Sequence, residues 1–368
     1  MKINKKILIS LIIFTAGILI TGVMSFIIRN NTEITRESLQ REFEKAVRPS
    51  DIFEAVLLVE NSNGSFSENF GYGRRNIDTP MLTASVGKLF TTACILMLNE
   101  EGRLSLDDKL TKYFNSDQLK GLHIYKGREY SFDLTISDLL FQTSGLPNTS
   151  RTLADEDAFF TFDQKITSVK SITPHFAPNT GKAYYANINF FILGEILEKI
   201  TAMPLSAVYE KMIFSPLGMT NTYLPANEND FIPHFYDGKE KTNRPKNIIS
   251  AGAAGGFVST PKDLMTFSKA FWQGKLFEKS VFEKLAVYKK LEPYFGPAYY
   301  GGGHMRISSE GIYKLLMGKG DLIGHSGVTG SFAFYYPEKD LYFIGDFSQL
   351  KKPSAPYLML MKLSKMAD

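Results

Sequence analysis

Hydrophobic and polar residues alternate in short runs near both ends of the chain, with the two-residue period of β-strands. FEAVLLVE and SFSENFGYG, at residues 53–60 and 65–73, flank a turn-forming Asn-Ser-Asn-Gly and predict a β-hairpin. Strand-like runs return from about residue 296, and SFAFYYPEKDLYFIGDF at residues 331–347 predicts a second hairpin around Pro-Glu-Lys-Asp. We therefore expect one antiparallel sheet to which both ends of the chain contribute strands.

The rest of the chain has the longer period of helices. Helices are predicted at residues 32–47, from Ser85 to about residue 101, and at residues 355–366 near the end. The middle, from about 104 to 285, is mostly helix and loop, and its TPKDLMTFSKAFW segment begins with an N-cap Thr260 and a helix-starting proline. Strands at both ends with helices between them predict an α+β fold. In this fold an antiparallel sheet is flanked by helices and carries a mainly helical insertion, within one domain over residues 31–368.

The first 30 residues form a separate unit. Residues 7–28 are 22 consecutive uncharged residues, preceded by three lysines (Lys2, Lys5 and Lys6) and followed by Arg29. A run of this length can span a bilayer as a helix, which takes about 20 residues. Its length and the poor cleavage site ITGVMS favour an uncleaved anchor over a signal peptide. By the positive-inside rule we expect a single-pass cell-membrane protein whose domain is extracytoplasmic, the alternative being secretion after cleavage.

Charge and metal-ligand residues exclude several functions. Four basic residues at the amino terminus account for the whole formal charge of +4, so the rest of the chain is neutral and no nucleic-acid partner is expected. Cys94, the single cysteine, lies in the apolar run TTACILML and is interpreted as a buried packing thiol. The five histidines have no short metal-ligand spacing, and no Walker A pattern occurs. We expect neither a metal nor a cofactor.

Three Ser-x-x-Lys pairs occur, and this spacing lets a lysine amine reach a serine hydroxyl on one helix face and take its proton. The pairs are Ser85/Lys88, Ser259/Lys262 and Ser348/Lys351. Ser259 is better explained as part of a helix start, and Ser348 follows a strand beside solvated lysines. Ser85 is expected at the mouth of an apolar helix with Lys88 one turn in, where burial lowers a lysine pKa. It is the preferred nucleophile, although a surface serine with an extended lysine is the alternative from local features.

Two further patterns carry polar groups. Tyr-x-Asn occurs at Tyr113-Phe-Asn115, in a predicted surface turn, and at Tyr185-Ala-Asn187, in a loop before an apolar helix. A tyrosine near a lysine can exchange protons, and an asparagine amide can hold a substrate carbonyl. GHSGVTGS, at residues 324–331, almost spells the G-x-S-x-G elbow of another hydrolase class but has Val328 where the second glycine belongs. We interpret it as an edge strand that lines a substrate groove.

Ser85-Val-Gly-Lys88, Tyr185-Ala-Asn187 and His325-Ser-Gly327, in this order, resemble the three motifs of the serine β-lactamase and penicillin-binding protein superfamily. The Tyr-x-Asn form is similar to class C β-lactamases, secreted DD-carboxypeptidases and related esterases. Intervening stretches match as well, among them EGRLSLDDKLTKYF, LTISDLLFQTSGLP and AAGGFVSTPKDL. The resemblance extends from about Phe53 to Phe347 and implies the β-lactamase/DD-peptidase fold.

The resemblance also implies roles for the motif residues. Ser85 is the acylated nucleophile, Lys88 or Tyr185 takes its proton, and Tyr185 then protonates the leaving group. Asn187, Ser326 and Gly327 contact the substrate, and the backbone N–H groups of Ser85 and Val328 form the oxyanion hole. His325 stands where β-lactamases have lysine.

The histidine is expected to be partly charged at neutral pH and still able to donate a hydrogen bond and pass a proton. This departure favours a carboxypeptidase or esterase over an efficient β-lactamase. The predicted substrate is a D-Ala-type peptide, a β-lactam or an ester. A non-catalytic surface binding or sensor protein on the same fold is the second hypothesis.

Overall fold

The computed structural model describes residues 33–48, 51–148, 157–292 and 296–367. Within these ranges no helix has both the length and the apolar character needed to cross a bilayer. The apolar run at residues 7–28, and with it the predicted membrane anchor, lies outside the described residues.

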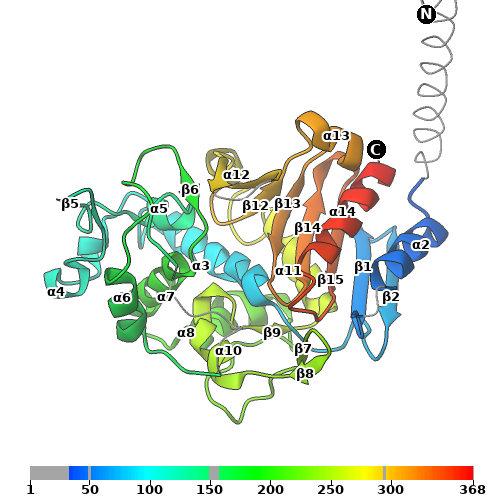
Figure 1. Ribbon diagram of the computed structural model, residues 1–368, viewed down its shortest axis with the longest axis horizontal. Helices are drawn as coiled ribbons and strands as arrows, with labels where there is room; N and C mark the ends of the chain where they lie inside the picture. The colour runs from blue at the N-terminus through cyan, green and yellow to red at the C-terminus, as the bar shows by residue number, and fades with distance from the viewer. Residues whose placement is uncertain (1–32, 49–50, 149–156, 293–295, 368) are drawn as a thin grey trace, which may run out of the picture.

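Among the described residues the largest sheet has nine strands in the order β2-β1-β15-β14-β13-β12-β11-β10-β6 (Figure 1). Their bounds are β1 Ala55–Asn61, β2 Ser67–Tyr72, β6 Ala183–Tyr184, β10 Lys289–Glu292, β11 Ala298–Tyr300, β12 Met305–Ile307, β13 Leu322–Ser326, β14 Ser331–Tyr336 and β15 Leu341–Asp346. Three two-stranded sheets join β3 Met81–Leu82 to β9 Val258–Ser259, β4 Ile124–Tyr125 to β5 Arg128–Glu129, and β7 Phe235–Asp237 to β8 Glu240–Thr242. The sheet and the helices around it confirm the predicted α+β fold.

The helices follow the predicted distribution. They are α2 Arg36–Val47, α3 Lys88–Glu100, α4 Ser116–Leu119, α5 Ile136–Leu140, α6 Phe162–Lys170, α7 Asn187–Thr201, α8 Leu205–Tyr209, α9 Ser215–Leu217, α10 Pro245–Ala251, α11 Pro261–Trp272, α12 Val281–Leu285, α13 Lys314–Met317 and α14 Ser354–Ala367. Shorter helical turns are η1 Ala84–Gly87, η2 Leu110–Lys112, η3 Glu210–Phe214, η4 Gly252–Ala254, η5 Gly311–Tyr313 and η6 Pro337–Lys339. The Thr260 side chain accepts a hydrogen bond from the Asp263 N–H, as predicted for the N-cap of α11.

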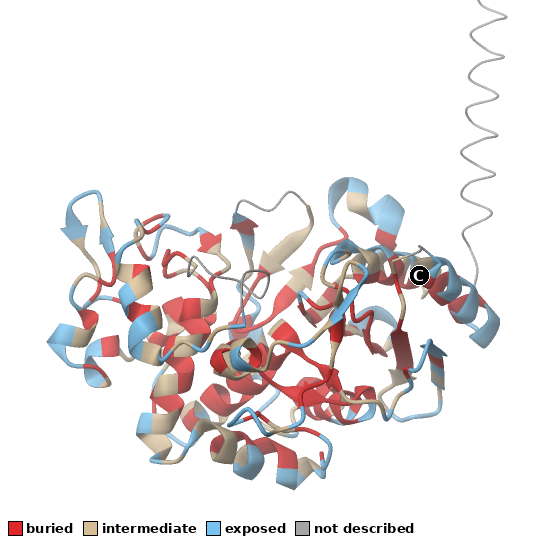
Figure 2. Ribbon diagram, turned by 60° about the horizontal axis from the view of Figure 1, so that its bottom comes forward, coloured by how far each residue is buried: buried red, intermediate tan, exposed pale blue. Residues whose placement is uncertain are grey.

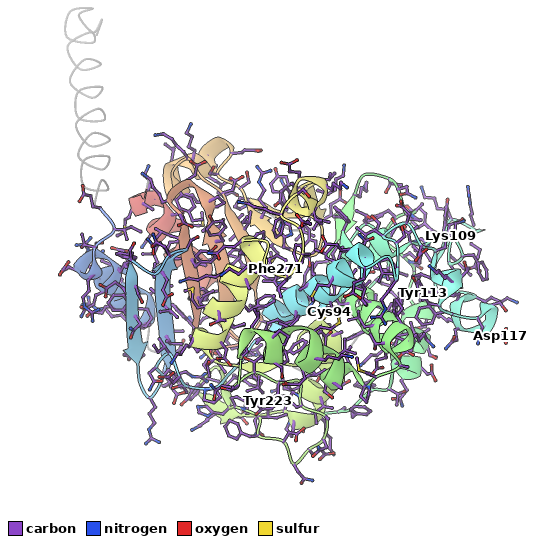
Figure 3. All side chains as sticks on the ribbon, turned by 180° about the vertical axis from the view of Figure 1, so that it is seen from behind. Cys94, Lys109, Tyr113, Asp117, Tyr223 and Phe271 are labelled. Atoms are coloured by element: carbon purple, nitrogen blue, oxygen red, sulfur yellow. The ribbon has the colours of Figure 1, made fainter. Side chains whose placement is uncertain are left out.

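Both predicted hairpins are present, and they pair with each other through β1 of the first hairpin and β15 of the second. β1 pairs antiparallel with β2 on one side and with β15 on the other, and β15 pairs with β14. Helices α2 and α14 cover one face of these strands, whereas α11 contacts β1, β14 and β15 from the other face (Figures 1 and 3). Because both faces are covered, every residue of β15 is buried.

The helical half is organised around α3. All residues of α3 from Lys88 to Leu96 are buried, including Cys94, whose thiol has a pKa raised by burial (Figures 2 and 3). This confirms the prediction of an inert packing thiol. Figure 3 also shows Tyr113, the other Tyr-x-Asn tyrosine, at the outer end of the helical half. Asn115 there is the N-cap of α4, so this copy forms a turn, as predicted.

Two features of the sheet differ from the predictions. The strands resume at β10, seven residues earlier than expected. Moreover, β6 comes from the middle of the chain yet pairs in parallel with β10, through Ala183 opposite Leu291. The middle segment is therefore not purely an insertion, since its two-residue strand closes the far edge of the sheet. Such a short strand has too few residues for a periodic signal.

Candidate active site

Ser85 lies in η1, a single 3₁₀ turn between β3 and α3, and not in the α-helix itself as the sequence suggested. β3 pairs with β9, and the N–H of Thr83 donates to the carbonyl of Phe257. On its other side, Thr83 accepts a hydrogen bond of 2.6 Å from the hydroxyl of Ser331 on β14. The turn that carries Ser85 is thus held between the small sheet and the large one.

Ala84, the residue before the nucleophile, has a φ of +43°, which costs a residue with a Cβ about 1 kcal/mol or more. Its surroundings leave little room for another conformation. A Cβ added at Gly255 would lie 2.4 Å from the Ala84 carbonyl oxygen, and one at Gly327 would lie 2.7 Å from the Ala84 Cβ. These two glycines allow the backbone segments from η4 and β13 to approach the nucleophile turn closely.

The amine of Lys88 is completely buried and makes three polar contacts. Its Nζ lies 3.1 Å from the Ser85 Oγ, 2.8 Å from the Asn187 Oδ1 and 2.5 Å from the Ala254 carbonyl oxygen. Two of these partners, the amide oxygen and the carbonyl oxygen, can only accept. The amine therefore donates one hydrogen bond to each of these two oxygens. Its third proton or its lone pair, depending on the charge state, faces the serine hydroxyl.

Burial lowers the pKa of Lys88 well below its ordinary value of 10.5. In the neutral form, two N–H bonds satisfy the Asn187 and Ala254 oxygens, and the lone pair is directed at the hydroxyl of Ser85. In that arrangement the neutral Lys88 amine can accept the serine proton. Asn187 and the Ala254 carbonyl thus orient the lone pair as well as satisfying the amine.

Tyr185 and Asn187 lie at the junction of β6 and α7. Nζ of Lys88 is 5.0 Å from the centre of the Tyr185 ring, so the tyrosine flanks the same amine. Two side chains hold the backbone of this junction. The N–H of Ala186 donates to Gln142 Oε1 at a distance of 2.9 Å. The N–H of Asn187 donates to Asn148 Oδ1, also at 2.9 Å. The amide of Gln142 also accepts from the Asn189 side chain at 2.5 Å.

His325 lies near the end of β13 and is 1% exposed. Burial, with a further contribution from nearby Lys88, lowers its pKa to about 3, so the ring is neutral. Its Nδ1 lies 2.8 Å from the Ser326 carbonyl oxygen and must donate there, which leaves Nε2 as an acceptor facing the hydroxyl of Tyr300 at 3.4 Å. The expectation of a partly charged histidine is wrong, because burial outweighs its intrinsic basicity. In this tautomer Nε2 has no proton to donate to a substrate.

The stretch around Ser326 differs in part from its interpretation as an edge strand. β13 lies inside the sheet, between β12 and β14, and only its last two residues extend beyond the pairing with β12, which ends at Gly324. The Ser326 hydroxyl is hydrogen-bonded to that of Tyr357 on α14. The N–H of Gly327 donates to the Ser331 carbonyl at 2.7 Å. Val328, 44% exposed, is the residue of this stretch that reaches the open site.

A cavity of about 620 Å³ opens beside the nucleophile. Its lining includes Ala84, Ser85, Asn187, Ala254, Gly255 and Val328. The other lining residues are Phe160 before α6, Asp163, Gln164, Lys165, Thr167 and Ser168 of α6, Phe191 of α7, and Asn247, Ser250 and Ala251 of α10. The volume suits a small molecule or a peptide residue. Tyr185 and His325 are not among the described residues that line it.

Lys165 is the cation among the described residues of the cavity wall. Its Nζ donates to the Ser250 carbonyl oxygen and lies 4.2 Å from the centre of the Phe191 ring. Burial lowers the pKa of Lys165 to about 8, so it is still largely protonated at neutral pH.

The sequence model described as Beta-lactamase matches residues 47–357, most of the chain. The chain belongs to the β-lactamase family. Penicillin-binding protein 4* of Bacillus subtilis is 26% identical over 321 residues, covering 79% of this chain and 66% of that protein. D-alanyl-D-alanine-carboxypeptidase/endopeptidase AmpH of Escherichia coli is 26% identical over 235 residues, covering 61% of this chain and 59% of that protein. The chain therefore spans about two thirds or less of the length of these relatives.

The fold is likewise that of the β-lactamase family. A D-stereospecific amidohydrolase from a Streptomyces species superposes with a TM-score of 0.70, at 24% identity, over 86% of this chain and 95% of its own. Family members are serine hydrolases. The resemblance stated from the three motifs is thus confirmed at the level of family and fold.

In this β-lactamase-family site, four supporting groups escaped the sequence analysis: Gln142, Asn148, Tyr300 and the Ala254 carbonyl. Gln142 and Asn148 both lie in or beside the LTISDLLFQTSGLP stretch, which matched the family but contained no catalytic motif. The similarity of this stretch to the family was visible in the sequence, but nothing in the sequence showed which chemical role the two side chains have. Ala254 lies in AAGGFVSTPKDL, which also matched the family, but the residue type does not show that its backbone carbonyl would hold an amine.

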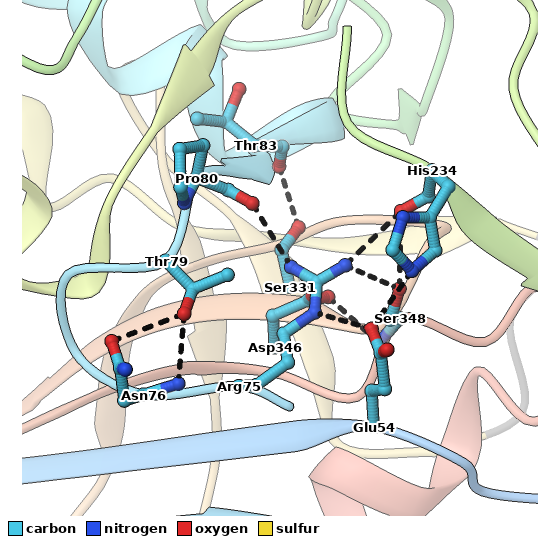
Figure 4. Close-up of polar contacts among 10 residues, drawn as sticks. All are labelled: Glu54, Arg75, Asn76, Thr79, Pro80, Thr83, His234, Ser331, Asp346 and Ser348. Atoms are coloured by element: carbon cyan, nitrogen blue, oxygen red, sulfur yellow. Dashed lines mark hydrogen bonds and ion pairs between the residues drawn. The ribbon is translucent and has the colours of Figure 1, made fainter. Parts of the chain in front are cut away.

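A buried ion network lies near the nucleophile turn and ties the two hairpins together (Figure 4). Arg75 contacts Glu54 at 3.3 Å and Asp346 on β15 at 3.1 Å, and all three side chains are nearly inaccessible. Burial raises the pKa of Asp346, whereas at Glu54 the pKa is lowered because His234 and Arg75 outweigh burial. Arg75 also donates to the Ser348 hydroxyl at 2.8 Å, which gives that serine a structural partner away from Ser85.

Proposed function

We propose that this β-lactamase-family protein is a membrane-anchored, extracytoplasmic serine hydrolase that works through an acyl-enzyme on Ser85. The observation that carries the proposal is the buried Lys88 amine, which is 3.1 Å from the Ser85 hydroxyl and held by two acceptors. A degenerate binding protein would have no need to keep an amine in this costly environment. The non-catalytic sensor hypothesis is therefore the weaker one.

In the first half-reaction the Ser85 Oγ attacks the substrate carbonyl carbon and its proton passes to the neutral Lys88 amine, directly or through Tyr185. The N–H groups of Ser85 and Val328 stabilise the resulting oxyanion. The carbon–nitrogen or carbon–oxygen bond then breaks, and the proton reaches the leaving group through Tyr185. An ester remains between Ser85 and the acyl group.

In the second half-reaction, water attacks the carbonyl of that ester. The same basic groups take a proton from the water and return one to the Ser85 Oγ as the acid leaves. His325 takes no part as a charged group, because its ring is neutral and buried. It is a positioning residue that connects the end of β13 with Tyr300.

The cavity supports an assignment of the two sides of the substrate. Tyr185, which protonates the leaving group, does not line it, whereas Ser85, Asn187 and Val328 do. The acyl portion of the substrate therefore occupies the cavity between α6 and α10, and the leaving group exits on the Tyr185 side. Lys165 in the cavity wall favours an acyl portion that carries an anionic group such as a carboxylate.

The substrate class we favour is a D-Ala-type peptide or amide. Its support is the similarity to the B. subtilis and E. coli proteins and, at the level of the fold, to the D-stereospecific amidohydrolase. A β-lactam can acylate the same serine, and an ester with the same acyl group is the alternative substrate. The neutral His325 offers no positive charge to a leaving-group carboxylate, and this observation keeps the ester alternative in place.

The anchor part of the proposal rests on sequence. The 22 uncharged residues 7–28 follow three lysines, and α2 begins only seven residues after Arg29. Fractionation of cells that express the full chain tests it: the protein should stay in the membrane pellet after alkaline carbonate washing. Release into the wash or the medium would contradict anchoring and leave the acyl-enzyme proposal intact.

The acyl-enzyme is tested by intact-protein mass spectrometry after exposure to a β-lactam and to a fluorophosphonate. Wild-type protein should gain one adduct, Ser85→Ala should gain none, and the matched control Ser259→Ala should react like wild type. A turnover panel of a D-Ala-D-Ala peptide, a chromogenic β-lactam and a p-nitrophenyl ester then identifies the leaving group. Absence of any adduct on folded wild-type protein would contradict the catalytic proposal.

A further inference from the structure

The turn formed by η5 and α13, residues 311–317, exposes more apolar surface than any comparable segment among the described residues. Ile312, Leu315 and Leu316 are 71%, 66% and 49% exposed, whereas Met317 at its end is completely buried and fastens the turn to the protein. We call these three side chains the α13 patch. Figure 2 shows the exposed turn at the upper edge of the molecule. Single exposed leucines are common, but three on one short turn indicate an interaction surface.

The position of the patch relative to the amino-terminal segment suggests its partner. α13 contacts α14, and α14 contacts α2, where Lys362 lies 4.0 Å from Glu42. α13 and α2 therefore pack against the same helix, α14. Figures 1 and 2 place α13 and the beginning of α2 on the same side of the molecule.

The chain between the apolar run and α2 is short. From Arg29 to Arg36 it can extend at most about 25 Å, at roughly 3.5 Å per residue. If residues 7–28 span a bilayer, the membrane surface is therefore held within that distance of the start of α2, on the side of the molecule where Figure 1 shows α13. Lys314 and Lys319 flank the apolar side chains and are exposed, which fits lipid phosphates at a membrane surface.

We propose that the α13 patch docks onto the lipid bilayer in which the chain is anchored, with Ile312, Leu315 and Leu316 inserted among the headgroups. This inference rests on the proposed membrane anchor and is independent of the acyl-enzyme. Its consequence is a second attachment point, which holds the hydrolase domain in one orientation on the membrane instead of leaving it to swing on a flexible link.

The single buried cysteine allows a direct test. In full-length Leu315→Cys, a thiol-reactive environment-sensitive dye reacts at position 315, since Cys94 is inaccessible. The matched control is Phe231→Cys, another exposed apolar position at 64%, four residues before the start of β7. Figure 1 shows β7 on the side of the molecule opposite α13. Both proteins are reconstituted in phosphatidylcholine vesicles with and without phosphatidylglycerol, some of which carry a spin-labelled headgroup. Circular-dichroism melting confirms that each variant is folded.

The dye at position 315 should be blue-shifted and quenched several-fold more strongly than the dye at position 231. Lys314→Glu/Lys319→Glu in the Leu315→Cys background should weaken the quenching most in vesicles that contain phosphatidylglycerol. Vesicle flotation separates the possible failures. A protein that floats with the vesicles but shows no quenching at position 315, or equal quenching at both positions, overturns the docking proposal and leaves the anchor in place.

Two other outcomes also overturn the docking proposal. A protein that does not float lacks the anchor on which the proposal rests, whereas its reaction with a β-lactam or fluorophosphonate would still stand. A blue shift at position 315 that grows with protein concentration in detergent, without lipid quenching, identifies a second copy of the chain as the partner of the patch.

Discussion

Ser85/Lys88 and Ser259/Lys262 have the same spacing and lie on two segments that are neighbours in the structure, yet their lysines lie in opposite environments. The strand before Ser85, β3, pairs with β9, which contains Ser259. Lys88 is fully buried against its serine, whereas the side chain of Lys262 is 67% exposed and lies 3.7 Å from Asp78. Ser259 is itself buried and is hydrogen-bonded to the Thr222 hydroxyl over 2.7 Å.

The difference lies in burial of the amine and not in the Ser-x-x-Lys spacing, because burial gives Lys88 the lowered pKa that the proposed base needs. In water a lysine keeps its proton at neutral pH and cannot accept another from serine. In the Lys88 environment the charge is disfavoured and two acceptors orient the lone pair. The third pair follows the same rule, because Lys351 is 62% exposed and bridges to Asp237.

The largest expected effect comes from exchanging the two serines for alanine. Ser85→Ala should lower kcat by about 10⁴-fold or more, since it removes the acylated atom. Ser259→Ala should leave kcat within about twofold and reduce the free energy of unfolding by about 1 kcal/mol through the lost Thr222 hydrogen bond. Steady-state hydrolysis measures kcat, and urea denaturation measures the free energy of unfolding. Equal loss of activity in both variants would contradict the distinction between the pairs.

The two lysines give the next effect. Lys88→Arg keeps a cation that cannot become neutral and should lower kcat/KM by roughly 10²- to 10⁴-fold. Lys262→Arg should have no measurable effect on hydrolysis, because its side chain is in solvent.

The pH profile of the wild-type enzyme identifies the same base. The neutral amine is the active form, and the pKa of Lys88 is lowered in the folded protein. As the pH rises, kcat/KM should therefore increase through that pKa and level off well below pH 10.5. It should fall again as the pH drops through the same pKa. His325→Gln should leave this acidic limb where it is, because His325, with a pKa of about 3, is already neutral there. A limb that moves in His325→Gln would show that the histidine is the titrating base.

A smaller effect is expected at Lys165, the lysine of the cavity wall. Lys165→Gln should raise KM about tenfold for substrates whose acyl portion carries a carboxylate, with little change in kcat or for uncharged acyl groups. The pKa of about 8 sets the direction of the pH dependence. The wild-type enzyme should prefer carboxylate-bearing acyl groups below pH 8 and lose this preference as the pH rises and Lys165 deprotonates. Matched substrates with a carboxylate and with its amide provide the measurement. Equal KM changes for both would contradict the assignment of the acyl side.

The smallest effect is expected for Ser326→Ala. The Ser326 hydroxyl is bonded to Tyr357, and its removal should change kcat by less than about threefold while the covalent adduct still forms. Mass spectrometry of the treated variant checks it beside Ser85→Ala. Loss of the adduct in Ser326→Ala with retention in Ser85→Ala would reverse the choice of nucleophile.

Much of the fold could be predicted because its main elements leave clear signals in the sequence. β1, β14 and β15 are short apolar runs beside turn residues, and α3 and α14 are long and largely apolar. β6 could not be predicted, because two residues hold no period and its partner β10 is remote in sequence. The helical turn at Ser85 was expected as α-helix, since a short 3₁₀ turn has the same composition.

The candidate site divides in the same way. The spacing of Ser85 and Lys88 is local and visible, and the three motifs together indicated the family. The charge state of His325 could not be predicted, because it depends on burial by β13, Tyr300 and Lys88, which only the folded chain brings together. Lys165 was missed for the same reason, since nothing near it in sequence places it across a cavity from Ser85.

The pairing of β1 with β15 has a consequence for how the protein is made. Val56 lies opposite Asp346, roughly 290 residues later, so the first strand must wait for almost the whole chain before the sheet can close. Synthesis proceeds from the amino terminus, and β13, which supplies His325 and leads to Val328, also arrives late. Ser85, the proposed nucleophile, is thus made early, but Val328, the second half of its proposed oxyanion hole, is added only near the end of translation. A truncated or stalled chain would carry Ser85 without the means to use it.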